Sequence, residues 1–76
     1  MRVYVNATGL DLPPGSTALD AVRAWNPSAA DDVAVGDRVI ADSRGIETAP
    51  NTPLHGGAIF RVLPVRRRPA GSEPND

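Results

Sequence analysis

One short helical segment, residues 17–25, stands between strand-like segments and most limits the folds open to this chain. Ser16 or Thr17 can cap its N-terminus. With Thr17 as the cap, Asp20 falls at the third helical position, close to a capping box, where its carboxylate complements the helix dipole. Leu19, Val22 and Trp25 follow at three-residue spacing, with Ala18 and Ala21 alongside, and form one apolar stripe. A single helix with one apolar stripe must pack that stripe on another element, so a sheet is expected beside it.

Strand-like segments lie on both sides of this helix. Residues 2–7 alternate with a two-residue period that puts Val3 and Val5 on one face. Thr8-Gly9 is predicted to turn the chain into a hairpin partner at residues 10–12, which Pro13-Pro14-Gly15 ends. Three further strands are predicted at residues 38–42, 46–48 and 58–63.

The helix is predicted to stop at Asn26-Pro27, because the residue before proline avoids helical geometry. Residues 28–35 are expected to form a second, short helical turn, with Asp31 and Asp32 on its solvated side. Gly36-Asp37 is predicted to turn the chain into the next strand.

This order of elements predicts an α+β fold, with a mixed four- to five-stranded sheet packed on one main helix. Residues 1–65 are assigned to this domain and residues 66–76, rich in Arg, Pro, Gly and Ser, to a flexible C-terminal tail. The predicted core consists of Val3, Val5, Leu12, Leu19, Val22, Trp25, Val39, Leu54, Phe60 and Val62.

Composition excludes several classes of function. A chain of 76 residues without cysteine has room for one modest core and no disulfide. The net charge of −1 favours neither nucleic acid nor an anionic membrane as a partner, and no apolar run could span a bilayer. We therefore expect a soluble, cytoplasmic bacterial protein. All eight basic residues are arginine, so no lysine could receive an isopeptide bond.

Three segments carry a resemblance to a known family: residues 2–6, residues 12–22 and residues 52–64, the last with a glycine-bearing turn before its strand. In this order they resemble the ThiS/MoaD sulfur-carrier family, whose members share the ubiquitin-like β-grasp fold. The likeness covers about residues 1–65 and implies that fold here. β-Grasp domains serve many functions, so the likeness implies the fold more strongly than the activity.

The resemblance also implies a mode of action. Members of the family work through a flexible C-terminal Gly-Gly, whose carboxylate an E1-like activating enzyme adenylates with ATP and Mg²⁺. The product becomes a thiocarboxylate for sulfur transfer, or passes through a thioester to an amine on a target protein. The carrier itself binds no cofactor and performs no catalysis, so an enzyme is not expected.

The chain departs from the family at its C-terminus. Its only Gly-Gly, Gly56-Gly57, precedes the closing strand and matches the turn of the family there. In one account, a peptidase of the JAB type cleaves after Gly71 and exposes it as the carrier terminus. Arg66, Arg67 and Arg68 would then pair with carboxylates of the activating enzyme. Pro69 and Ala70 are unlike the pliable arm of the family.

The second account is a non-conjugating β-grasp module that docks on a partner protein. Tyr4, Ile59 and Leu63, with Val65 beside them, are expected on the outer face of the sheet, where they would form a docking face. Scattered surface apolar residues are the alternative interpretation of the same pattern.

Other chemical candidates are weak. His55 is the only histidine and has no second ligand of the kind that binds zinc, so no metal site is predicted. Asp31-Asp32 lacks the companions of an acid–base pair.

Overall fold

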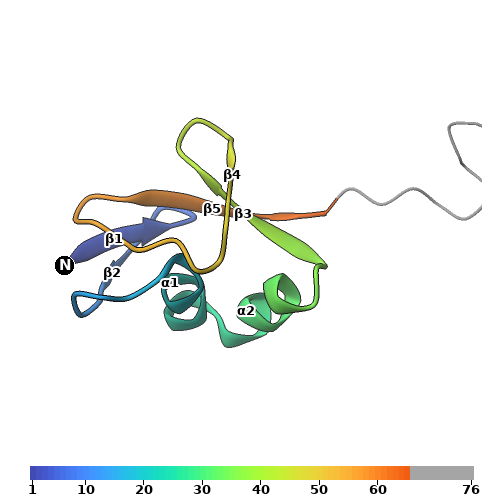
Figure 1. Cartoon of the computed structure of the whole chain (residues 1–76), viewed down its shortest axis with the longest axis horizontal. Helices are drawn as coiled ribbons and strands as arrows, with labels where there is room; N and C mark the ends of the chain where they lie inside the picture. Colours follow the sequence, from blue (N-terminus) through green and yellow to red (C-terminus); the bar gives the residue numbers. More distant parts are fainter. Residues whose placement is uncertain (66–76) are drawn as a thin grey trace, which may run out of the picture.

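The computed structural model describes residues 1–65, which form a mixed five-stranded sheet and two helices. The elements in chain order are β1 (Arg2–Val5), β2 (Thr8–Asp11), α1 (Ala18–Trp25), α2 (Pro27–Ala34), β3 (Arg38–Asp42), β4 (Glu47–Thr48) and β5 (Ile59–Pro64). The strand order is β2-β1-β5-β3-β4, so the last strand lies in the centre of the sheet (Figure 1). β1 and β5 are parallel, and every other pair is antiparallel. The expected α+β class and mixed sheet are confirmed.

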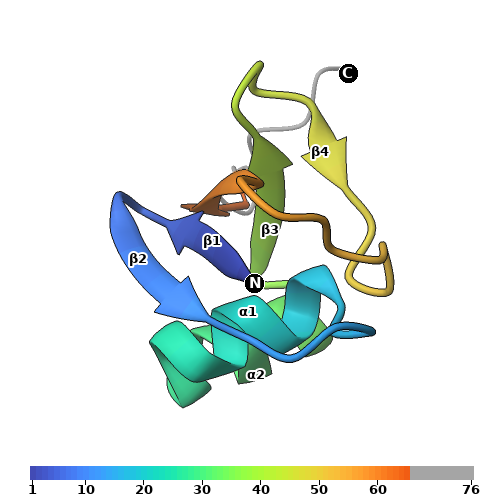
Figure 2. The same cartoon turned by 90° about the vertical axis from the view of Figure 1, so that its left-hand side faces the viewer.

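Both helices lie on the same side of the sheet (Figures 1 and 2). α1 packs on β1 and β2, and α2 packs on β3. The helices also pack on each other, so the second helix is a full partner of the first. The expected single main helix is therefore wrong, since each helix has eight residues.

The first hairpin turns two residues earlier than predicted. Asn6 and Ala7 form the turn with positive φ values of 48° and 69°, as a two-residue type I′ turn requires. Thr8 and Gly9 belong to β2, where they pair with Val5 and Tyr4. Asn6 tolerates the left-handed conformation, and its Oδ1 accepts a hydrogen bond from the N–H of Val62 at 3.1 Å. This contact fixes the turn against β5.

The start of α1 is capped as the sequence predicts. Thr17 Oγ1 accepts from the N–H of Asp20 at 3.3 Å, and the Asp20 carboxylate accepts from the N–H of Thr17 at 2.9 Å. The two bonds complete a capping box. The loop before β5 also contributes, because the N–H of Ala18 donates to the carbonyl of Thr52. The loop thereby ties the helix start to the segment that leads into β5.

Asn26 joins the two helices. Its backbone N–H donates to the carbonyl of Val22 at the end of α1. Its side chain accepts from the N–H groups of Ser28 and Ala29 and caps the start of α2. Pro27 then occupies the first turn of α2, where it loses no helical hydrogen bond. The proline that ends the first helix therefore also begins the second.

A Schellman motif ends α2. The N–H of Asp37 donates to the carbonyl of Asp32 at 2.7 Å, and the N–H of Gly36 donates to the carbonyl of Val33 at 3.2 Å. Gly36 has a φ of 87°, which this motif requires. The predicted turn at Gly36-Asp37 is confirmed. Asp31 is exposed, whereas Asp32, also expected on the solvated side of this helix, is half-buried and pairs with Arg38 at 3.1 Å.

The core between helices and sheet contains five alanines, whereas the predicted core has none. Five of the ten predicted core residues are buried: Val3, Val5, Val22, Phe60 and Val62. Four others, Leu12, Leu19, Trp25 and Leu54, are half-buried and pack against this core. The expected place of Val39 in the core is wrong, because its register partner is the exposed Leu63, on the face of the sheet away from the helices. The places of these five residues are taken by small side chains, namely Ala18, Ala21, Ala29, Ala30 and Ala58, together with Val33 and Ile40. Alanines let the two helices approach the sheet closely, which pushes the larger side chains to the rim of the core.

Candidate functional site

The face of the sheet opposite the helices is covered by neither of them, and we call it the outer face. Buried and exposed residues alternate along β1 and β5, so the side chains of Tyr4, Ile59, Arg61 and Leu63 lie on this face. The strand register adds Val39 opposite Leu63 and Ala41 opposite Arg61, both from β3. The outer face is therefore built around the central strand β5.

Three exposed apolar side chains gather on the outer face. Tyr4 and Ile59 are direct neighbours across the parallel β1–β5 pair, and Leu63 lies four residues further along β5. Their exposed fractions are 37%, 49% and 40%. Tyr4 and Ile59 are register partners on adjacent strands, so both side chains stand on the same part of the outer face.

Gly9 shapes this surface from the edge of the sheet. It lies opposite Tyr4 in β2, and a Cβ atom placed on it would come within 3.3 Å of the Tyr4 ring and 2.7 Å of the Arg2 guanidinium. The missing side chain therefore leaves room for both side chains to lie across β2. The sequence interpretation assigned Gly9 to a turn and missed this role.

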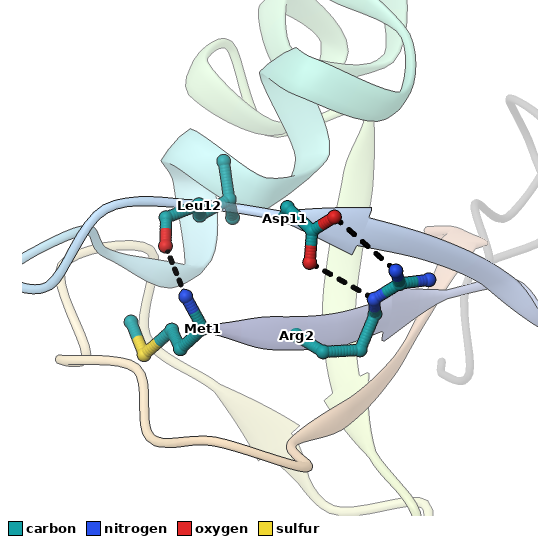
Figure 3. A network of polar contacts seen from close by, with 4 residues as sticks. All are labelled: Met1, Arg2, Asp11 and Leu12. Carbon is teal, nitrogen blue, oxygen red and sulfur yellow. Dashed lines mark hydrogen bonds and ion pairs between the residues drawn. The ribbon is translucent and has the colours of Figure 1, made fainter.

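Arg2 is held at the rim of the outer face by Asp11. The Arg2 Nε and one terminal nitrogen donate to the two Asp11 carboxylate oxygens at 3.0 and 3.2 Å (Figure 3). Beside this pair, the N-terminal ammonium of Met1 donates to the carbonyl of Leu12 at 2.6 Å (Figure 3). The charge of Arg2 is thus matched within the chain.

Arg61 differs from the other arginines of residues 1–65. Arg2, Arg23, Arg38 and Arg44 each form an ion pair with an aspartate. Within the same part of the chain, no carboxylate oxygen lies within 4.0 Å of the Arg61 guanidinium. Arg61 is exposed and stands between Ile59 and Leu63 on β5. The sequence pattern gives the orientation of Arg61, but its lack of an ion pair depends on the strand register.

An open hollow of about 260 Å³ lies where β3 ends and β5 begins. Its lining includes Asp42, Arg44 and His55, together with Ile59 of the outer face. The Asp42 carboxylate is occupied, because it accepts hydrogen bonds from the N–H groups of Arg44 and Ile46 and from the Arg44 guanidinium. The hydrogen bond from the Ile46 N–H is the main cause that lowers the pKa of Asp42, and the contacts with Arg44 add to it.

The predicted site residues fall into two groups. Tyr4, Ile59 and Leu63 share the outer face. Arg66, Arg67, Arg68 and Gly71 lie outside the described residues. Val65 is half-buried at the end of β5, where its N–H donates to the carbonyl of Asp37.

Gly56-Gly57 lies inside the fold, as expected from its position before β5. The N–H of Gly57 donates to the carbonyl of Arg2 at 2.8 Å, and Gly57 has a φ of 86°. This Gly-Gly pair therefore serves as a turn.

No group of three or more His, Asp or Glu side chains comes together as metal ligands would within residues 1–65. Neither helix of this part of the chain has the length and apolar character that crossing a membrane requires.

No protein-family model matches the chain, and comparisons with curated proteins and with solved structures give no match either. The likeness to the sulfur carriers therefore remains a resemblance of sequence pattern.

Proposed function

We propose that this chain is a ubiquitin-like β-grasp protein of the sulfur-carrier type. The observation that supports the proposal best is the strand order β2-β1-β5-β3-β4 with a parallel β1–β5 pair at its centre. In the β-grasp fold, an antiparallel hairpin precedes the helical segment, and the closing strand lies in the middle of the sheet beside the first strand. β5 has this place here. The described residues end at Val65, two positions after the exposed Leu63 of β5.

The proposed chemistry takes place at the carboxylate of Gly71 after the residues beyond it are removed, by a peptidase of the JAB type. A carboxylate oxygen attacks the α-phosphorus of ATP, the bond to the bridging oxygen breaks, and pyrophosphate leaves with its Mg²⁺. A sulfur nucleophile then attacks the acyl carbon, the bond from that carbon to the AMP oxygen breaks, and AMP leaves. Attack by sulfide gives a terminal thiocarboxylate, which donates its sulfur to a small-molecule acceptor. Attack by a thiol gives a thioester, whose acyl group passes to an amine of a target protein while the thiol is released.

In this proposal the chain supplies a substrate carboxylate, and an E1-like enzyme supplies the catalysis. Arg66, Arg67 and Arg68 serve as contacts to carboxylates of that enzyme. The outer face serves as the surface by which the enzyme recognises the domain. No ATP or metal site is assigned to the chain itself.

A second candidate is a docking module without C-terminal chemistry. The exposed side chains of Tyr4 and Ile59 on adjacent strands favour it, because they are available whatever happens at residue 71. The two candidates share the outer face and differ in whether the C-terminus reacts.

Hydroxylamine trapping tests the carrier chemistry. Acyl-adenylates and thioesters react with hydroxylamine to give a C-terminal hydroxamate that mass spectrometry can locate. We expect the full-length chain, incubated with extract of its native cells, ATP and Mg²⁺, to give an ATP-dependent hydroxamate on Gly71.

The matched control is the same substitution at a glycine within the fold, Gly56. Gly71→Ala is expected to reduce the hydroxamate, whereas Gly56→Ala should leave it unchanged, because Gly56 has an ordinary φ and no atom within 4 Å of an added Cβ. If no ATP-dependent product forms in the unaltered chain, the docking module becomes the better proposal.

A further inference from the structure

We infer that the outer face binds a protein surface on which a carboxylate stands among apolar side chains, and that Arg61 receives this carboxylate. The inference rests on the proposed function only in taking the outer face as the docking face. It adds the chemistry of the partner and the residue that selects it.

The first step is the apolar surface. Tyr4 and Ile59 are neighbours across β1 and β5, Leu63 follows on the same strand, and all three are more than a third exposed. Removing apolar surface from water is favourable, so such a patch gains from being covered. The partner must therefore present apolar side chains.

The second step is the charge at the centre of that surface. Arg61 lies between Ile59 and Leu63, and in the described part of the chain it is the one arginine that forms no ion pair. Its direct cross-strand neighbour on β3 is Ala41, which is uncharged. The next strand carries Glu47 opposite Ala41, two strand spacings or about 9–10 Å from β5.

The third step is the cost of covering Arg61. A guanidinium taken out of water without an acceptor is strongly unfavourable, whereas a bidentate carboxylate satisfies it. A partner that covers the apolar patch also covers Arg61, and so must bring an acceptor. A protein carboxylate flanked by apolar side chains meets both requirements at once.

Other occupants fit this surface less well. A nucleic acid or an anionic membrane is favoured by several cations, whereas Arg2 at the rim is already neutralised by Asp11. A second copy of the chain, placed on a two-fold axis through β5, brings Arg61 against Arg61. Within residues 1–65, a nucleic acid or a membrane would find a single unpaired cation on the outer face, and a second copy in this arrangement would give Arg61 no carboxylate.

Site-specific photo-crosslinking with charge reversal tests the inference. Ile59 is replaced by p-benzoylphenylalanine in the full-length chain within its native cells, and crosslinked partner peptides are mapped by mass spectrometry. We expect a protein product whose mapped contact includes an aspartate or glutamate among apolar residues. Arg61→Glu should lower its yield about tenfold or more, and Arg61→Lys should lower it less. Changing the mapped partner acid to arginine should restore the yield with Arg61→Glu.

Arg23→Glu is the matched control, because it reverses an exposed arginine on α1. It should keep the crosslink yield, and a thermal unfolding scan of both variants checks that each remains folded. The inference is overturned if Arg61→Glu leaves the yield unchanged, if the mapped contact has no acid, or if the product is a nucleic acid, a lipid or a second copy.

The two proposals fail separately. A charge-dependent crosslink without a hydroxamate on Gly71 would leave the inference standing and remove the carrier chemistry. A hydroxamate on Gly71, together with a crosslink yield that Arg61→Glu does not change, would support the carrier chemistry and overturn the inference.

Discussion

At the scale of single residues, the turn between β1 and β2 holds the backbone in an unusual conformation. Asn6 and Ala7 are the two non-glycine residues in the described chain with positive φ. Asn6 gains a hydrogen bond from Val62 in return, but the Ala7 methyl group gains nothing comparable and is exposed. Left-handed geometry costs an alanine about 1–2 kcal/mol, so the second turn position is the least favourable residue choice in the hairpin.

Ala7→Gly should therefore stabilise the protein. Glycine adopts this φ without strain, and after its larger entropy in the unfolded chain is subtracted we expect a gain of about 0.5–1 kcal/mol. Urea unfolding measures it. Ala24→Gly, the same change on the exposed side of α1, should instead lower stability by about 1 kcal/mol. A loss of stability in Ala7→Gly would mean that this turn has a different geometry.

Asp42 gives the fold a defined dependence on pH. The hydrogen bond from the Ile46 N–H, with the contacts from Arg44, lowers the pKa of this carboxyl in the folded state. A lowered folded pKa means that the charged carboxylate stabilises the fold above the unfolded pKa of about 3.9, and that this contribution disappears as pH falls through the folded value.

We expect the stability difference between the unaltered chain and Asp42→Asn to be greatest near neutral pH and to shrink below about pH 4. Urea unfolding at a series of pH values follows this difference. A difference that stays constant down to strongly acidic pH would show that the charge of Asp42 does not stabilise the turn.

At the scale of elements, Asn26 caps both helices, α1 at its C-terminus and α2 at its N-terminus. It closes α1 with its backbone and opens α2 with its side chain. Asn26→Ala removes the cap of α2 and should cost about 1 kcal/mol in urea unfolding. Asn26→Asp keeps an acceptor at the cap and should retain most of the stability. Equal losses in the two variants would show that the cap bond is not what Asn26 contributes.

Much of the fold could be predicted from local signals. The period-two segments, the capping box at Thr17 and the turn at Gly36 each specify their own element, and all three were placed correctly in their main features. The first turn was misplaced because Thr8-Gly9 has typical turn residues, whereas Asn6-Ala7 becomes a turn only when β1 and β2 pair around it.

The burial of side chains was harder to predict, because it depends on how close the helices come. Leu19 and Trp25 form a clear apolar stripe, yet alanines at neighbouring positions are the residues buried against the sheet. The outer face shows the same limit. Tyr4 and Ile59 could be placed on it by alternation alone, but their pairing across β1 and β5 and the lack of an ion pair at Arg61 depend on the strand register.

At the scale of the whole molecule, the parallel β1–β5 pair brings together three features that lie far apart in the sequence. It places the last described strand in the centre of the sheet, sets Tyr4 beside Ile59, and brings the chain to Val65 next to the exposed Leu63. A partner bound on the outer face therefore lies close to the point from which residues 66–76 continue. This proximity is what the carrier proposal requires of its activating enzyme.

The intact mass of the protein purified from its native cells tests the carrier proposal most directly. The account predicts a species that ends at Gly71, with one oxygen of the terminal carboxylate replaced by sulfur or with the glycine joined to another protein. An unmodified mass that includes all 76 residues, from actively growing cells, would contradict the carrier chemistry. The outer face would then be the functional site of a docking module.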